Sequence, residues 1–518
     1  MGRKIHILWT DDEVELLRPY ILFLEEKDYQ VTTAANGTDA LRLVEENEFD
    51  LIFLDENMPG ITGLETLEQI KAQHPSIPVV MITKSEEEDI MDEALGSKIS
   101  DYLIKPVNPK QILLTIKKNL DSRRLVTEKT ASSYQSQFGQ IGVQINAAVN
   151  FDDWAEIHKK LIYWERELES GQAGGMEEVL RMQKTEADHE FSRFIRKNYI
   201  SWFKEAADEA PLLSPGVFQE QVFPLLKRGR VVVVLIDNLR FDQWKIIERE
   251  MAGLFRTELE SIFCSILPTA TQYARNAMFA GMMPADIRKR YPRLWVEEHE
   301  EGGKNAFEEE LCRAQMERLG IQASLNYEKI SNQRAGKKLV EHYKDLLNFD
   351  LNILVYNFVD MLSHARTEMD MIRELAYDES SYRSLVQSWF QHSYLFDLLK
   401  QLVAHDISLV LTTDHGAVRV NNPLKVIGDR MTSVNLRYKQ GKNLNYDPKE
   451  VFEITRPADV RLPRSNVTTA YIFAANKDFM VYPNNYNHFV NLYRNTFQHG
   501  GISMEEMLVP LAVLSPVR

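Results

Sequence analysis

Short apolar runs that end in acidic or histidine side chains are the feature that most restricts how this chain can fold. LIFLD, which ends at Asp55, and VVVVLID, which ends at Asp237, have the length of a buried strand. Such runs alternate with segments whose apolar residues have helical spacing. This alternation predicts α/β domains with parallel sheets covered by helices, and ligands of such sheets gather at the carboxyl ends of the strands.

Length and charge divide the chain. At roughly 150 residues per domain, 518 residues suggest about three domains. Residues 1–124 hold 14 basic and 24 acidic side chains, so this part carries −10 of the net charge of −15. The acidic balance argues against a protein that coats nucleic acid through bulk charge. Two cysteines, the absence of a membrane-length apolar run and the absence of a signal peptide favour a cytoplasmic protein.

The first 124 residues predict five strands that alternate with five helices, one of them over 86–97. Asp11 and Asp12 end the first strand and Asp55 ends the third, so we expect the three carboxylates to meet. Three such oxygen ligands suit Mg²⁺. Thr83 and Lys105 end the last two strands, which brings a hydroxyl and a cation to the same cluster. These groups are what phosphoryl transfer to a carboxylate needs.

The motifs ILWTDDE, LIFLDENMPG, MITKS and DYLIKPV make this unit resemble a response-regulator receiver domain over its whole length, which implies a CheY-like doubly wound fold. The resemblance implies that Asp55 is the phosphoacceptor. It also implies a magnesium site formed by Asp11, Asp12, Asp55 and Asn57. The residues expected to switch conformation on phosphorylation are Thr83, Tyr102 and Lys105.

Residues 125–205 show no strand pattern. Two helical stretches precede the sequence GQAGG and a third follows it. Together they predict a helical bundle that links two larger domains. Aromatic residues on the apolar faces are expected to be core and not a cofactor site: Phe151, Trp154, Tyr163 and Trp164.

Residues 206–518 predict a second, larger α/β domain with a parallel sheet. Its strand ends and neighbouring turns carry six candidate metal ligands: Asp237, Asp360, His364, Asp414, His415 and His499. Mixed Asp and His sets suit Zn²⁺, and six ligands exceed one tetrahedral site. Two zinc ions about 4 Å apart are therefore expected. The stretch from Trp295 to Lys344 reads as an insertion, and a substrate lid is one interpretation of it.

Thr271 ends the sequence PTAT, in a turn just before a predicted helix, where backbone N–H groups favour an anion. The order Asp237, PTAT, Asp360/His364, Asp414/His415 and His499 resembles the alkaline phosphatase superfamily, and the tail FQHGGISMEEMLVPL resembles its PglZ branch. The resemblance implies that Thr271 is the nucleophile. It also implies one zinc on Asp360, His364 and His499, and a second zinc on Asp237, Thr271, Asp414 and His415.

A receiver, a helical linker and a PglZ-type domain in one chain resemble response regulators linked to type IX secretion and gliding. The resemblance implies a PorY-like sensor histidine kinase, a homodimer formed on phosphorylation, contact with a sigma factor, and a zinc phosphodiesterase that acts on oligonucleotides. The hypothesis for the chemistry is attack by Thr271 on a phosphodiester through a phospho-threonine intermediate. Asn238, Arg275 and Asn276 are candidate substrate contacts, and the sequence shows neither a third metal site nor an arginine clamp of the kind a monoesterase would use.

Two other classes of function stay open at this point. A receiver with a DNA-binding output would normally end in a small basic helix-turn-helix unit, but this output exceeds 300 residues and is net acidic. A PglZ-type fold with structural metals would instead be a phosphorylation-switched platform that docks a transcription or secretion regulator, because fold does not fix function.

Overall fold

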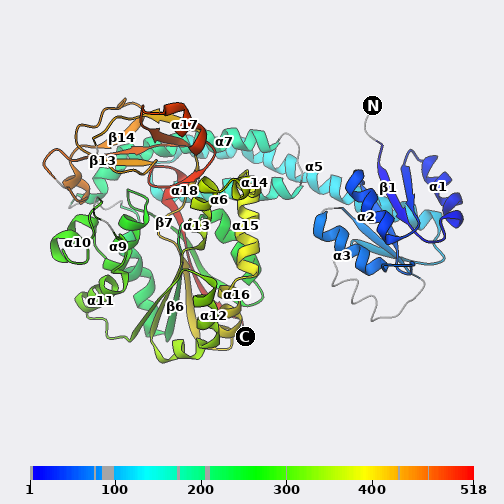
Figure 1. Cartoon of the computed structure of the whole chain (residues 1–518), viewed down its shortest axis with the longest axis horizontal. Coiled ribbons are helices and arrows are strands. Elements are labelled where there is room, and N and C mark those ends of the chain that lie inside the picture. The colour runs from blue at the N-terminus through cyan, green and yellow to red at the C-terminus, as the bar shows by residue number, and fades with distance from the viewer. Residues whose placement is uncertain are drawn as a thin grey trace. The chain divides into compact units, whose positions relative to one another are not determined.

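The computed structural model describes residues 4–74, 77–83, 99–171, 176–204, 210–298, 300, 302–429, 432–464 and 466–517. The chain forms two compact units (Figure 1). The smaller contains Met1–Gln135 and Ser170–Gly174, and the larger contains Ser136–Glu169 and Gly175–Arg518. None of the helices described combines the length and apolar character that a membrane span requires.

The smaller unit holds a five-stranded parallel sheet with the order β2-β1-β3-β4-β5. Its strands are β1 (His6–Thr10), β2 (Gln30–Ala34), β3 (Leu51–Asp55), β4 (Val79–Thr83) and β5 (Asp101–Ile104). Its helices are α1 (Arg18–Glu25), α2 (Gly37–Glu46), α3 (Gly63–Gln73) and the first part of α5 (Pro109–Ala147). The predicted CheY-like receiver fold is confirmed, and the helix predicted over 86–97 lies outside the described residues.

Alternating side chains of the central strands build a core on each face of this sheet. Leu8 and Leu54 belong to one buried cluster, and Ile7, Trp9 and Phe53 belong to the other. Successive residues of a strand point to opposite faces, so a continuous apolar run needs cover on both sides. Because β1 and β3 are neighbours in the middle of this sheet, the residues at their carboxyl ends meet at one edge.

The linker helices α6 (Phe151–Gly171) and α7 (Met176–Asn198) belong almost wholly to the larger unit. Trp154 packs edge-on against Phe191 of α7, with ring centroids 5.5 Å apart. Phe151 and Trp164 are also buried, as expected from the helical spacing. Tyr163 is 55% exposed, so its predicted place in the core is wrong. It precedes Trp164 by one residue, and adjacent residues of a helix point about 100° apart.

The larger unit contains a six-stranded sheet with the order β7-β18-β10-β6-β9-β8. Its strands are β6 (Arg230–Ile236), β7 (Phe255–Cys264), β8 (Leu325–Ile330), β9 (Leu351–Tyr356), β10 (Ile407–Thr412) and β18 (Leu508–Pro516). The predicted parallel sheet is wrong for β18, which pairs antiparallel with both β10 and β7. An apolar run carries no mark of its direction, and this reversal brings the amino end of β18 to the carboxyl edge of the other strands.

Helices cover both faces of the six-stranded sheet, with α9 and α11 on one side and α15 and α16 on the other (Figure 1). The helices are α8 (Phe241–Met251), α9 (Thr271–Ala280), α10 (Pro284–Arg290), α11 (Glu308–Leu319), α12 (Gln333–Glu341), α13 (Phe358–Glu368), α14 (Asp370–Leu375), α15 (Glu379–Gln391), α16 (Tyr394–Leu402), α17 (Tyr486–Tyr493) and α18 (Met504–Met507). The described helices and sheets therefore give the large α/β domain that the sequence predicts.

Three smaller sheets complete the larger unit, and Figure 1 shows β13 and β14 at the end of this unit where α17 also lies. They pair β11 (Val418–Arg419) with β17 (Phe497–Gln498), β12 (Asn422–Lys425) with β16 (Asp478–Val481), and β15 (Ala470–Ala474) with both β13 (Tyr438–Gly441) and β14 (Val451–Ile454).

The stretch from Trp295 to Lys344 is built into the domain. Its strand β8 pairs with β9 along the sheet edge, and its helix α11 packs against α9. A segment that supplies a sheet strand and a core helix is part of the scaffold, so the interpretation of this stretch as a lid is wrong.

Candidate functional site

The carboxyl edge of the six-stranded sheet gathers the predicted ligands of the larger unit. Asp237 follows β6, Asp414 and His415 follow β10, and Asp360 lies in the first turn of α13 after β9. His499 reaches the same edge from the loop that leads into α18 and the reversed strand β18. The structure brings these side chains into two groups: Asp360, His364 and His499, and Asp237, Asp414 and His415.

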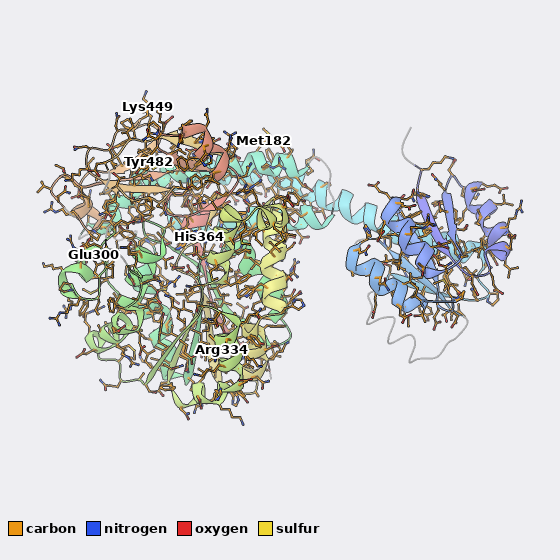
Figure 2. All side chains as sticks on the ribbon, in the orientation of Figure 1. Met182, Glu300, Arg334, His364, Lys449 and Tyr482 are labelled. Carbon is orange, nitrogen blue, oxygen red and sulfur yellow. The ribbon has the colours of Figure 1, made fainter. Side chains whose placement is uncertain are left out.

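The first group is open to solvent on one side. His499 Nε2 lies 3.6 Å from Asp360 Oδ1, and His364 Nε2 lies 3.5 Å from Asp360 Oδ2. His364 is 58% exposed because it lies on the outer face of α13, four residues after Asp360. Figure 2 labels it at the end of the central sheet that faces the small sheets.

The second group is buried and contains the predicted nucleophile. His415 Nε2 lies 3.8 Å from Asp237 Oδ1 and 3.6 Å from Asp414 Oδ2. Thr271, the first residue of α9, has its Oγ1 3.1 Å from His415 Nε2 and 3.5 Å from Asp237 Oδ1. The hydroxyl therefore lies within the second group, next to the amino end of a ten-residue helix.

The donor sets fit zinc. Ligands about 2.0–2.2 Å from a tetrahedral ion lie about 3.3–3.6 Å apart, close to the separations within both groups. His415 Nδ1 lies 3.2 Å from the Gly416 carbonyl oxygen, and His499 Nδ1 lies 3.2 Å from that of Thr269. Both contacts leave Nε2 facing the carboxylates, which is the usual support of a metal-binding histidine. The two imidazoles stack with centroids 4.3 Å apart, so the two groups are neighbours.

The two threonines of PTAT have different environments. Thr269 is fully buried; its Oγ1 donates to the Gly501 carbonyl oxygen at 2.9 Å and accepts from Gly500 N at 3.0 Å. It therefore holds the loop that carries His499, while Thr271 faces the second group. Sequence reasoning assigned Thr269 no role, because its partners lie more than 230 residues away.

The three predicted substrate contacts are all buried, with exposures of 0–1%. Asn238 Nδ2 donates to Asp360 Oδ1 at 3.3 Å. Arg275 Nε donates to Asp414 Oδ2 at 3.0 Å, and its guanidinium also pairs with Asp237 and Glu308. Asn276 Nδ2 donates to the carbonyl oxygens of Gln272 and Lys304. The donor groups of these side chains thus orient the ligands and their loops. Asn238 Oδ1 and Asn276 Oδ1 have no hydrogen-bond partner among the described residues, so a role of these side chains in binding substrate stays a prediction.

The ionisation of this cluster reflects crowded negative charge. Burial raises the pKa of Asp237 well above its usual range, and the Asp414 and Asp360 carboxylates add to the shift against the pull of Arg275. Although burial opposes it, Arg275 with His415 holds the pKa of Asp414 below its usual range. Burial and the neighbouring His415 lower the pKa of His499 to about 3, which keeps the imidazole in its neutral, metal-binding form. A bound cation would relieve the excess of negative charge on Asp237.

The linker helix α7 supports the loop behind these ligands. Asp188 Oδ1 accepts a hydrogen bond from Met504 N at 2.9 Å, and Lys184 Nζ lies 3.7 Å from Glu505 Oε1. A Cβ on Gly416 would lie 2.1 Å from the Glu505 carbonyl oxygen, so α18 touches the backbone next to His415. Glu506 Oε1 in turn accepts from Gly501 N at 2.9 Å. Contacts of α18 thus reach the loops of two candidate metal ligands, His415 and His499.

In the smaller unit the structure brings Asp11, Asp12 and Asp55 together. Lys105 Nζ lies 2.8 Å from Asp11 Oδ2 and 2.9 Å from Asp55 Oδ1. Burial raises the pKa of Asp55, and Lys105 opposes the shift. The carboxylates and the lysine suit a magnesium ion and a phosphoryl group.

The remaining receiver residues lie around this cluster. Asn57 is exposed just after β3, and Tyr102 lies half-buried on β5. Thr83 ends β4, and its hydroxyl donates to the carboxylate of Glu56. Sequence reasoning assigned no role to Glu56; its place directly after Asp55 was the available signal.

Comparison with known families accounts for most of the chain. The BREX system PglZ alkaline phosphatase-like domain matches residues 217–514, more than half of the chain. The chain belongs to the PglZ family. The response regulator receiver domain matches residues 7–117, and the PorX response regulator linker domain matches residues 124–203. Together they give this PglZ protein the architecture of a PorX-like response regulator, and both the PglZ and receiver families commonly bind metal ions.

Individual relatives match the receiver of this PglZ protein. The transcriptional regulatory protein ZraR of Klebsiella oxytoca is 37% identical over 141 residues, 27% of this chain and 32% of that protein. The alginate biosynthesis regulator AlgB of Pseudomonas aeruginosa is 36% identical over 125 residues, 24% of this chain and 28% of that protein. The chain thus spans about a third of the length of these curated relatives.

Solved receiver structures also match part of the chain. A CheY-like receiver from Methanospirillum hungatei is 30% identical, with a TM-score of 0.23, over 23% of this chain and 96% of its own. CheY4 of Vibrio cholerae is 29% identical, with a TM-score of 0.22, over 23% of this chain and 100% of its own. A receiver implies a histidine kinase that phosphorylates it.

Proposed function

We propose that this response regulator is a zinc-dependent phosphodiesterase with Thr271 as nucleophile, controlled by phosphorylation at Asp55. Its proposed substrates are oligonucleotides, and its proposed setting is the control of type IX secretion and gliding. The observation that carries the proposal is the place of Thr271 Oγ1, within 3.1–3.5 Å of His415 and Asp237 and beside the second ligand group.

Each ligand group would hold one zinc ion. Asp360, His364 and His499 would bind the first ion, and Asp237, Asp414, His415 and Thr271 would bind the second. Bound zinc would supply Lewis acidity, which makes a coordinated hydroxyl nucleophilic at neutral pH and offsets charge on phosphoryl oxygens. The buried excess of carboxylate charge and the two supported imidazoles favour this assignment.

The residues then divide the work of the reaction. Thr271 Oγ1 attacks phosphorus in line; the bond between Oγ1 and phosphorus forms as one ester bond breaks, and the leaving alkoxide takes up a proton. Water then cleaves the phospho-threonine and regenerates the hydroxyl. The first turn of α9 favours the non-bridging oxygens through its backbone N–H groups. Arg275 and Asn238 keep Asp237, Asp414 and Asp360 in place.

The same contacts favour a diester over a monoester. A monoester carries more charge at the transferred group and would need a further cation beside the nucleophile. Arg275, four residues after Thr271, is fully buried and paired with carboxylates. It therefore leaves no guanidinium for a dianionic phosphate.

The receiver would switch this activity. A PorY-like sensor kinase would phosphorylate Asp55 in the presence of Mg²⁺ bound by Asp11, Asp12, Asp55 and Asn57. The added charge beside Lys105 and Thr83 would bias the switch residues, with Tyr102 among them, toward a homodimer that contacts a sigma factor. Sedimentation with and without beryllofluoride tests this step: the mass should double with beryllofluoride, and an unchanged mass would refute the switch.

Metal content and turnover, measured together, test the enzyme. The zinc-loaded chain should bind two zinc ions per chain and hydrolyse bis-p-nitrophenyl phosphate. Thr271→Val should keep the fold and lose at least about a thousandfold in turnover, as expected for a nucleophile. His499→Ala should lose both zinc and turnover. Thr468→Val, an exposed threonine of the same unit, is the matched control and should change neither. Full turnover by Thr271→Val would refute the covalent route, and two bound zincs without turnover would favour a docking platform.

A further inference from the structure

A strongly basic surface lies beyond the far end of the helix that begins at Thr271. It consists of segments 284–293 and 456–464, and we call it the 284/456 surface. The two segments hold seven basic and two acidic side chains, a local charge of +5 in a chain of −15. Figure 1 shows α10, which begins the first segment, at the outer edge of the larger unit next to α9.

Direct contacts join the two segments into one surface. Ala285 N donates to the Arg461 carbonyl oxygen at 2.9 Å, and Arg288 Nη1 donates to the Arg464 carbonyl oxygen at 2.7 Å. Arg461 and Asp286 form an ion pair at 3.5 Å. Both segments line a cleft of about 430 Å³. The positive charges are therefore held in one place, although 162 residues, 294–455, separate the two segments in the sequence.

Part of this charge is available to a ligand. Arg288 pairs with Glu297, Arg461 with Asp286, and Arg456 with Asp459. The other four cations are exposed, and among the residues that the structure describes no carboxylate lies within ion-pair distance of them: Lys289, Arg290, Arg293 and Arg464. The Arg290 guanidinium lies over the Tyr291 ring, 5.7 Å from its centroid. Exposed cations interleaved with an aromatic ring are the usual features of a single-strand nucleic-acid surface.

The chain that leaves the 284/456 surface returns to the nucleophile. Gln272 Nε2, one residue after Thr271, donates to the Val296 carbonyl oxygen at 2.8 Å. The Tyr273 ring contacts Trp295 edge-on at 5.9 Å, and the Tyr273 hydroxyl donates to Glu298 at 3.2 Å. Helix α9 is ten residues long, or about 15 Å. The segment that follows the basic surface thus packs against the first turn of α9, and the length of that helix is one that a few nucleotides can span.

We infer that the 284/456 surface binds the phosphates of a single-stranded oligonucleotide whose scissile phosphate lies at Thr271. This inference rests on the proposed diesterase and deepens it, because it makes substrate length a determinant of KM. A small diester such as bis-p-nitrophenyl phosphate fills only the metal site. An oligonucleotide of eight residues reaches the basic surface as well and gains contacts there.

The test compares short and long substrates. In the triple variant Lys289→Gln/Arg293→Gln/Arg464→Gln, KM for an octanucleotide should rise at least about tenfold with kcat unchanged. Turnover of bis-p-nitrophenyl phosphate and of a dinucleotide should stay within about twofold of the parent. The slope of log affinity against log salt for the octanucleotide should fall by about two, since each phosphate contact on a single strand contributes about 0.7.

A second triple variant controls for the general loss of positive charge as the cause of a higher KM. Arg228→Gln/Arg230→Gln/Arg256→Gln removes three arginines from a cleft at the opposite end of the sheet, where β6 begins. It should leave KM for the octanucleotide unchanged. Equal losses in the two triples, or an unchanged KM in the first, would overturn the inference.

Binding separates failure of this inference from failure of the proposed enzyme. Fluorescence anisotropy of a labelled octanucleotide is measured on the zinc-loaded Thr271→Val chain, with and without the 284/456 triple. If the parent lacks diesterase activity but binding weakens in the triple, the surface stands and the enzyme proposal fails. If binding is equal, the surface proposal fails. If binding is equal and the triple abolishes the beryllofluoride dimer, the surface contacts an acidic protein such as the receiver.

Discussion

The two candidate sites share one device, a cation placed between two carboxylates at the ends of neighbouring strands. In the receiver, Lys105 contacts Asp11 and Asp55. In the larger unit, Arg275 contacts Asp237 and Asp414. Parallel strands deliver carboxylates to one edge, and a cation offsets the repulsion that follows. The sites differ in access: the Lys105 side chain is 17% exposed, and that of Arg275 is 0% exposed.

Access suits each cation to a different task. The lysine can meet an incoming phosphoryl group, because it is reached from solvent and sits beside the exposed Asp12. The arginine is enclosed by Asp237, Asp414 and Glu308, so it stays in place and orients the ligands. A partly exposed cation therefore suits a site that is modified and restored, and a fully buried cation suits a site whose geometry is fixed when the protein folds.

The largest effect in this comparison is expected from Arg275→Met. The change leaves the buried Asp237 and Asp414 carboxylates without the guanidinium and leaves Glu308 with Lys329 alone. This should lower the free energy of unfolding of the metal-free larger unit by about 3–5 kcal/mol. Zinc should restore part of the loss, because it supplies positive charge to Asp237 and Asp414. Denaturant unfolding with EDTA and with zinc measures both. Lys105→Met is the comparison and should cost the receiver less, because the Lys105 side chain is 17% exposed and water can reach the carboxylates that it leaves. Equal costs would refute the contrast.

A smaller effect, at most about 2 kcal/mol between pH 6.5 and pH 8, is expected from the titration of Asp188 in the linker helix α7. Burial, with the Glu505 charge, raises the pKa of Asp188 to about 8, whereas in the unfolded chain it has its usual value of 3.8. The folded state therefore binds the extra proton, and stability falls as pH rises from about 4 to about 8, by at most about 1.4 kcal/mol per pH unit. Asp188→Asn should remove this fall.

The window from pH 6.5 to pH 8 isolates Asp188 from the buried His158, whose pKa is lowered to about 4 and which affects stability only below pH 6.5. The free energy of unfolding of Asp188→Asn relative to the parent should rise across this window. Ser192→Ala is the control. Ser192 lies on the same helix as Asp188 and its Oγ also contacts the rest of the unit, at Asn476, but it carries no carboxyl group that could titrate. Parallel pH profiles for Asp188→Asn and the parent would contradict the prediction.

The smallest change in stability is expected from Asp12→Asn in the open site. Asp12 is exposed, so the free energy of unfolding should change by no more than about 0.5 kcal/mol. Magnesium affinity should nevertheless fall at least about tenfold, since a charged ligand is lost. Isothermal titration with Mg²⁺ measures the affinity, and Asp28→Asn, an exposed acid on a surface turn, should leave it unchanged. Unchanged magnesium binding in Asp12→Asn would remove Asp12 from the site.

The strand ends explain why so much of both sites could be predicted from the sequence. Asp55 and Asp237 each follow an apolar run, and a sheet turns such positions into neighbours without any knowledge of side-chain packing. Arg275 shows the limit of this reasoning. Its spacing from Thr271 places it on the correct face of α9, but its partner Glu308 comes from a helix in another part of the sequence. Only packing decides whether such a cation meets substrate or carboxylates.

The sequence also carried no sign of the direction of β18 or of the long-range contacts that hold the ligand loops. The apolar pattern of β18 fits either direction, so the reversal that delivers His499 has no local signal. The bond between Asp188 and Met504 joins residues 316 apart, and the linker pattern shows only a helix with an apolar face. Local periodicity predicts elements; it does not say which of them hold a ligand loop from behind.

The position of β18, second from the β7 edge of the sheet, has a consequence for folding during protein synthesis. This strand lies between β7 and β10, and the loop before it carries His499. In the chain, His499 and β18 come after all five of the other strands of this sheet. Domains generally fold as units while the ribosome is still at work. The receiver can finish folding early. In the larger unit, β7 cannot join the other strands of the six-stranded sheet until β18 leaves the ribosome. A nascent chain would therefore complete the carboxylate cluster of the receiver long before it completes the two ligand groups of the larger unit.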